Sequence, residues 1–154
     1  MSTVSEIADG LKKHPGGFRL DAGERLFLHD THDNLVVTDR RVQTESSTYL
    51  LTDLADVRLL PFMSPARNRW RTSSGLVAKL GLLLHALATL PKKAMPVRLA
   101  VVEGVYRDRP VTLALSKLIR KGDEQGEKEE WERLERIVAA IKSALQGQAN
   151  EGAP

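Results

Sequence analysis

The sequence predicts a single α+β domain in which an antiparallel sheet of about six or seven strands is covered by a C-terminal helix. Three observations lead to this prediction. From residue 18 to 60, β-branched and aromatic residues are separated by short turn-forming stretches. From 97 to 115, apolar and polar residues alternate. After that, apolar residues recur at helical spacing.

The first half of the chain is expected to begin with a short helix and continue as strands. Thr3 to Glu6 have the spacing of a capping box, and Pro15 with two glycines ends this N-terminal segment by residue 17. Turn-forming residues at 30–34 and 45–47 then divide the chain, which implies an antiparallel meander. The strands expected from this division cover residues 25–29, 35–44, 48–51 and 57–60.

An insert at 61–96 separates these strands from the rest of the sheet. We expect a loop at 61–74, because it contains two prolines and three arginines, and an apolar helix at 75–90 that Pro91 ends. Strands follow at 97–101 and 111–115, with a turn at 107–110 between them.

The last helix should pack across the sheet, because its apolar residues form one stripe with intervals of three and four. We expect residues 147–154 to form a flexible tail. The stripe consists of Trp131, Leu134, Val138, Ile141 and Leu145.

Charge is unevenly distributed along the chain. Between Val57 and Val102 there are eight basic residues and no Asp or Glu. Because the whole chain carries +3, the remainder carries −5 (3 − 8 = −5). The same stretch contains the leucine-rich helix, so its surface is expected to meet something apolar, anionic or both.

The candidate contact residues of the insert are apolar or basic. As a helix, residues 76–90 would span roughly 22 Å, less than the roughly 30 Å of a hydrocarbon core. Three interpretations remain open: a buried helix of the fold, an interface with a protein partner or a second copy, or a helix lying on an anionic membrane. The candidate residues are Arg67, Arg69, Trp70, Arg71, Leu76, Leu80, Leu83, Leu87, Leu90, Lys92 and Lys93.

Three short stretches resemble bacterial pleckstrin-homology-like (PH-like) domains. Gly23 to Leu26 resembles their "GE-x-L" opening, and Leu35 to Val42 resembles their second strand, "x-V-T-(D/N)-x-R". Tyr49 to Val57 resembles the passage that follows it. The resemblance covers residues 20–60, and residues 97–145 by pattern alone. It implies a strongly bent sheet or split barrel, an apolar insert before the final strands, and binding of lipids, peptides or proteins rather than catalysis.

Other chemistry has weaker support in the sequence. His29, Asp30, His32 and Asp33 could ligate a metal, but turn formation explains them as well. The alternation of arginines with Trp70 could grip nucleic acid, yet no reader motif accompanies it. No cysteine, nucleophile elbow or phosphate loop is present.

We therefore expect a non-enzymatic interaction or scaffold module that uses the insert and needs no cofactor, resident metal or small-molecule substrate. Its partner would be another protein or a second copy, with an anionic membrane as the alternative and nucleic acid unlikely. Because no secretory signal is visible, we expect the bacterial cytoplasm, including the inner face of the membrane.

Overall fold

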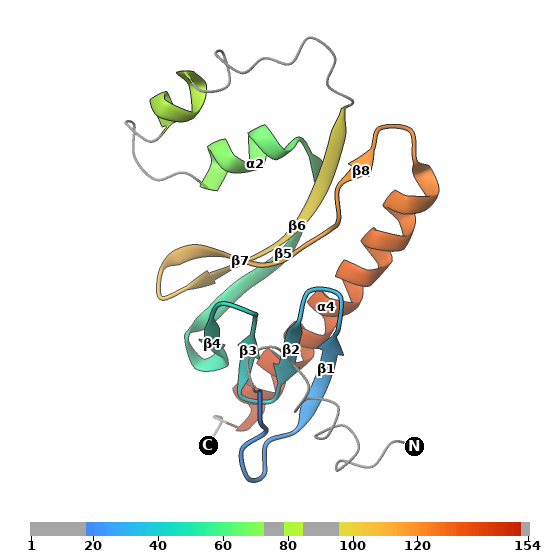
Figure 1. Cartoon of the computed structure of the whole chain (residues 1–154). Coiled ribbons are helices and arrows are strands. Elements are labelled where there is room, and N and C mark those ends of the chain that lie inside the picture. The colour runs from blue at the N-terminus through green and yellow to red at the C-terminus, as the bar shows by residue number, and fades with distance from the viewer. Residues whose placement is uncertain (1–17, 73–78, 85–95, 152–154) are drawn as a thin grey trace.

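The computed structural model describes residues 18–72, 79–84 and 96–151 (Figure 1). The predicted N-terminal helix within residues 1–17 lies outside this part. The described chain is α+β, with two four-stranded antiparallel sheets and a long C-terminal helix, α4 (Glu124–Glu151). The predicted α+β class is therefore confirmed, but the described strands number eight rather than six or seven and form two sheets rather than one.

The first sheet follows the chain order, and the second is built around one central strand. The first sheet contains β1 (Leu26–Asp30), β2 (Leu35–Thr38), β3 (Arg41–Gln43) and β4 (Thr48–Leu50). A 3-10 turn, η1 (Leu51–Asp53), leads into the second sheet. There β6 (Val97–Tyr106) pairs on one side with β5 (Leu54–Met63) and on the other with β7 (Arg109–Leu115) and the short β8 (Ile119–Arg120).

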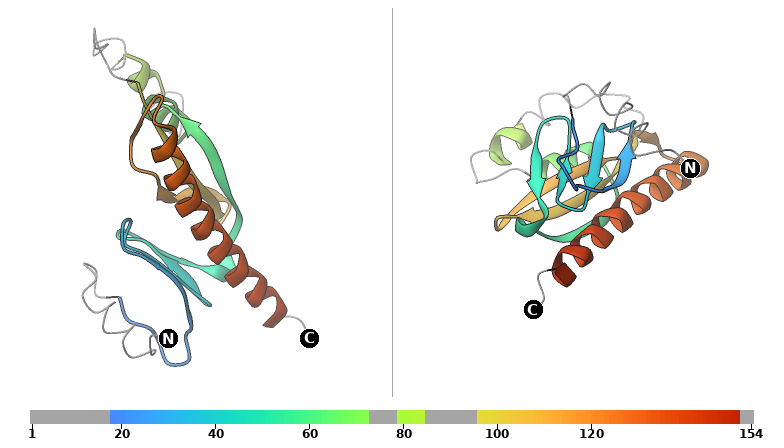
Figure 2. Two further views of the ribbon diagram at one scale, coloured as in Figure 1. Left: turned by 90° about the vertical axis from the view of Figure 1, so that its right-hand side faces the viewer. Right: turned by 90° about the horizontal axis from the view of Figure 1, so that it is seen from below.

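Helix α4 covers both sheets and closes the core between them (Figure 2). Its residues Leu134, Ile137, Ile141 and Ala144 are buried at spacings of three, four and three. They pack with buried residues from both sheets, namely Leu35, Val37 and Val42 from the first and Val57, Ala100, Val102 and Leu113 from the second. Burial of this shared apolar surface is the main stabilising contribution to the fold.

The predicted helical stripe is confirmed, but its centre lies elsewhere. Leu134 and Ile141 are fully buried, whereas Trp131, Val138 and Leu145 are only partly buried at the edge of the core. The centre of the stripe also includes Ile137 and Ala144, which the prediction omitted. The buried face is therefore rotated relative to the predicted one.

The prediction of one strand over residues 35–44 was wrong, because the chain reverses at Asp39 and Arg40. β2 and β3 are antiparallel partners, with Val37 opposite Val42. The Thr38 hydroxyl accepts hydrogen bonds from the backbone N–H groups of Arg40 and Arg41, which stabilises the turn. This local polar contact outweighs the β propensity of the flanking residues.

The prediction of a loop at 61–74 was also wrong. β5 continues to Met63, and Pro61 is tolerated because β5 is an edge strand of its sheet. Helix α2 (Pro65–Thr72) begins immediately afterwards. The Ser64 hydroxyl accepts a hydrogen bond from the Arg67 N–H, and proline suits the first position of a helix.

The predicted flexible tail at 147–154 begins too early, because α4 continues to Glu151. The Gln148 side chain explains part of this extension. Its amide nitrogen donates a 2.7 Å hydrogen bond to the Asp39 carbonyl oxygen in the β2–β3 turn. This contact joins the last turns of the helix to the first sheet.

Replacing Ile141 with Ala should lower the free energy of unfolding by about 2–5 kcal/mol, because it leaves a cavity where α4 meets both sheets. Denaturant unfolding measures this change. Lys142→Ala, at the exposed neighbouring position, is the matched control and should change stability by less than about 0.5 kcal/mol. Equal effects of the two substitutions would contradict the assigned core.

Candidate interaction site

Helix α2 presents its side chains mostly to solvent. None of its residues is buried, and Arg67, Arg69 and Trp70 are exposed. The Trp70 side chain remains 43% exposed, although the Lys79 ammonium lies 5.6 Å from the centre of its ring. That cation–π contact brings the described part of the predicted apolar helix beside α2.

Residues 79–84 are helical, as predicted, and expose three large apolar side chains. Leu80 is 48% exposed, Leu83 is 46% exposed and Leu84 is 66% exposed. The predicted contact residues Leu80 and Leu83 therefore lie at the surface, and Leu84 joins them although the sequence analysis omitted it. We call Trp70, Leu80, Leu83 and Leu84 the insert surface.

The other predicted contact residues cannot be placed on this surface. Leu76, Leu87, Leu90, Lys92 and Lys93 lie outside the described residues. Within the described segment, the exposure of three leucines argues against the interpretation of the helix as ordinary core.

Helix α2 is attached to the second sheet by Glu103 of the central strand β6. The Glu103 side chain is only 7% exposed and accepts hydrogen bonds from Arg71 of α2 and from Arg58 of β5 (Figure 1 locates these elements). Burial alone would raise the pKa of the Glu103 carboxyl. The hydrogen bonds from Arg71 and Arg58 outweigh burial and lower this pKa below its ordinary value.

Some of the basic residues in and around the insert therefore form ion pairs with carboxylates of the same chain. Arg58 and Arg71 both pair with Glu103. Arg98 lies 3.4 Å from Glu127 of α4. Among the described basic residues between 57 and 102, Arg58, Arg71 and Arg98 thus have carboxylate partners, so less positive charge remains for an external anionic surface than the sequence suggested.

Two of the three stretches that carry the PH-like resemblance, 23–26 and 35–42, meet in one polar network around the buried Glu24. The Glu24 carboxylate accepts hydrogen bonds from the Thr38 hydroxyl at 2.6 Å and from two nitrogens of Arg41 at 2.9 and 3.0 Å. The Arg25 N–H donates to the Asp39 carboxylate. Their role is structural, because they tie the segment before β1 to the β2–β3 turn.

Burial and hydrogen bonding have opposite effects on the pKa of Glu24, and together they favour its ionised form. Burial would raise the Glu24 pKa, but hydrogen bonds from Arg41 and Thr38 lower it below the ordinary value of 4.5. Arg41 also stacks on the Phe18 ring, with its guanidinium carbon 4.7 Å from the ring centre. The Glu24–Arg41 ion pair therefore forms the centre of the network, and the Phe18 ring covers Arg41 at its edge.

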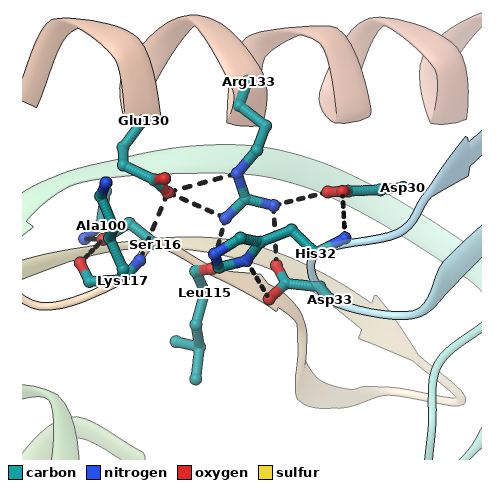
Figure 3. A network of polar contacts seen from close by, with 9 residues as sticks. All are labelled: Asp30, His32, Asp33, Ala100, Leu115, Ser116, Lys117, Glu130 and Arg133. Atoms are coloured by element: carbon teal, nitrogen blue, oxygen red, sulfur yellow. Dashed lines mark hydrogen bonds and ion pairs between the residues drawn. The ribbon is translucent and has the colours of Figure 1, made fainter. Parts of the chain in front are cut away.

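A second network surrounds Arg133 of α4 and includes three of the candidate metal ligands, namely Asp30, Asp33 and His32, which contacts both aspartates (Figure 3). Its guanidinium donates to Asp30 and Asp33 at 2.5 and 3.0 Å, and to Glu130 at 2.9 Å. It also donates to the Leu115 carbonyl oxygen at 2.9 Å. The two aspartates thus hold an arginine, and the described residues contain no group of three or more ligands arranged for a metal.

Arg133 is held in its charged form by these partners. Burial would lower the pKa of its guanidinium, but the hydrogen bonds that it donates to Glu130 and Asp33 raise this pKa above the ordinary value. Because its side chain is only 14% exposed, little solvent screens these contacts.

Comparison with known proteins gives no match to a family model, to a curated protein or to a solved structure. Over the described ranges, the helices are too short or too polar to cross a membrane.

Replacing Arg133 with Met should lower the free energy of unfolding by about 3–5 kcal/mol, because three largely buried carboxylates would lose their common cation. Denaturant unfolding at neutral pH checks this expectation. Arg136→Met removes the same charge from an exposed position of α4 and should have an effect below about 0.5 kcal/mol. A stable Arg133→Met variant would show that the network is dispensable.

Acidification should weaken the fold through Glu24. Its pKa is lower in the folded state than in the unfolded state, so its stabilisation is present above pH 4.5 and is lost as the pH falls through the folded pKa. In Glu24→Gln, the decrease of unfolding free energy below pH 4.5 should be shallower by up to about 1.4 kcal/mol per pH unit. Glu45→Gln, at an exposed turn, should retain the parent slope. Parallel curves for the parent and Glu24→Gln would contradict the assignment.

Proposed function

We propose that this chain is a non-enzymatic interaction module with a PH-like fold, which contacts a protein partner or a second copy through the insert surface. Two four-stranded antiparallel sheets closed by a C-terminal helix support the PH-like assignment, because the resemblance implies a bent sheet of this kind. The contacts between the first two resembling stretches, made by Thr38 and Arg41 with Glu24, support it further.

The observation that carries the functional proposal is the exposure of the insert surface. Trp70, Leu80, Leu83 and Leu84 are between 43% and 66% exposed, and they belong to the segment that joins β5 to β6. Burying such side chains against another molecule is favoured by the hydrophobic effect. Trp in particular is common among residues that dominate binding at protein interfaces.

An anionic membrane is the second candidate for this surface. Its support is the combination of exposed leucines with Trp70 and with the basic side chains of Arg67 and Lys79. Protein contact is favoured over it because Arg58, Arg71 and Arg98 are paired with carboxylates. Burial of apolar surface should then contribute more to the free energy of binding than charge does.

Leu80→Asp/Leu84→Asp should abolish self-association or partner capture while leaving the thermal unfolding midpoint nearly unchanged. Light scattering over a concentration series measures self-association. To detect a partner protein, a photo-reactive residue is placed at position 83 and cross-linked to its neighbours in the native cell. Leu118→Asp is the matched control, because Leu118 is 59% exposed but lies in the β7–β8 connection.

The same variants separate the two candidates. The partner proposal expects association that persists in high salt and disappears in the double variant. Binding of the parent to anionic vesicles, lost in high salt and weakened by Arg67→Ser, would favour the membrane instead. If the double variant no longer unfolds cooperatively, the helix that contains Leu80 and Leu84 belongs to the core. That result would contradict both the partner proposal and the membrane alternative.

A further inference from the structure

A pocket is lined by residues of α2, β5, β6 and β7. Figures 1 and 2 show that α2 and α4 lie on opposite sides of the second sheet. On β6, Ala100 and Val102 belong to the core, so alternation along the strand places Glu103 and Val105 on the opposite face. The pocket has a volume of about 770 Å³, within the range of sites that hold small molecules. It is distinct from the insert surface.

Two arginines converge on this pocket from different elements. Arg58 comes from β5 and Arg71 from α2, and Glu103 between them accepts hydrogen bonds from both. The Arg71 guanidinium also donates to the Asn68 side-chain oxygen at 3.2 Å. Glu103 therefore fixes the orientation of both guanidinium groups before any ligand arrives.

One arginine donor in this arrangement has no acceptor within the described part of the chain. The Arg71 Nε is buried and has no hydrogen-bond partner among the residues that the structure describes. A buried charged donor that lacks an acceptor is costly, and a bound water, ion or ligand is one way to satisfy it. The Arg58 side chain, at 66% exposure, retains contact with the pocket.

The lining restricts the chemical class of the ligand. Arg58 and Arg71 contribute +2 and their shared partner Glu103 contributes −1, so this cluster carries +1 and suits a ligand group with a single negative charge. Asp56, also in the lining, brings the total to zero and disfavours a doubly charged anion. Val105, Pro110 and Val111 provide an apolar side to the pocket. A carboxylate can accept paired hydrogen bonds from a guanidinium while an attached apolar group covers these side chains.

We infer that this pocket binds a small organic monocarboxylate, with its carboxylate on Arg71 and Arg58 and its apolar part against β6 and β7. Glu103 is a positioning residue for the two arginines. The sequence analysis predicted no small-molecule ligand, because the arginines and Glu103 come from three segments that only folding brings together. The inference does not depend on what the insert surface contacts.

Titration of the ¹⁵N-labelled chain with benzoate tests the inference, with benzamide as an uncharged probe of nearly the same shape. Benzoate should give saturable shifts of the Arg71 Nε–H signal and of the Glu103 and Thr112 amides. Benzamide and acetate should bind at least about tenfold more weakly, since one lacks the charge and the other lacks most of the apolar part.

Substitution of the arginines identifies the site. Arg58→Gln should weaken benzoate binding by about tenfold or more, while Arg71 and Glu103 keep α2 attached. Arg67→Gln removes the same charge from α2 outside the pocket lining and should leave the affinity unchanged. The inference is wrong if benzoate gives no saturable shifts, if benzamide binds equally well, or if Arg67→Gln and Arg58→Gln weaken binding equally.

Discussion

The Arg133 side chain joins three parts of the fold that are far apart in the sequence. From α4 it reaches Asp30, the last residue of β1, and Asp33 in the β1–β2 turn of the first sheet. It also reaches the last residue of β7 in the second sheet, through the carbonyl oxygen of Leu115. Apolar burial along α4 provides most of the stabilisation, but it is not directional. The ion pairs specify how α4 sits against the two sheets, because their geometry tolerates little displacement.

The insert is attached to this body in a different way. Helix α2 buries none of its residues, and the paired contact of Arg71 with Glu103 connects it to the sheet. Leu80, Leu83 and Leu84 follow and remain exposed. The same ion pair lies in the lining of the pocket beside Glu103, where Glu103 orients Arg58 and Arg71. The apolar side chains of the insert surface remain exposed to solvent.

The elements that the sequence predicted well are those specified by local pattern. The period of three and four residues around Leu134 and Ile141 places the last helix on the core, and alternation identifies β6. The errors arose where a single polar side chain decides the local structure. The Thr38 hydroxyl turns a predicted strand into a hairpin. Ser64 starts a helix where proline had suggested a loop, although a serine before proline is itself a readable helix-start signal.

The candidate sites were less predictable, because they depend on contacts between distant residues. Arg133 and Asp30 are 103 positions apart, so no local pattern could separate a metal ligand from an ion-pair partner. Likewise, the sequence located the leucines of the insert but could not tell whether they are exposed. Whether these leucines are exposed depends on where the end of β5 and the start of β6 hold the two ends of the insert.

The central claim is that the two sheets and α4 form the cooperatively folded body, whereas the insert serves contact rather than stability. Replacing residues 64–96 with a short glycine-rich turn tests it most directly, because Met63 and Leu99 are antiparallel partners at this end of the sheet. Denaturant unfolding of this variant, followed by fluorescence of Trp131, should show one cooperative transition with a slope close to that of the parent, since Arg58 still pairs with Glu103. A variant without a cooperative transition would show that the insert belongs to the core and would contradict this account.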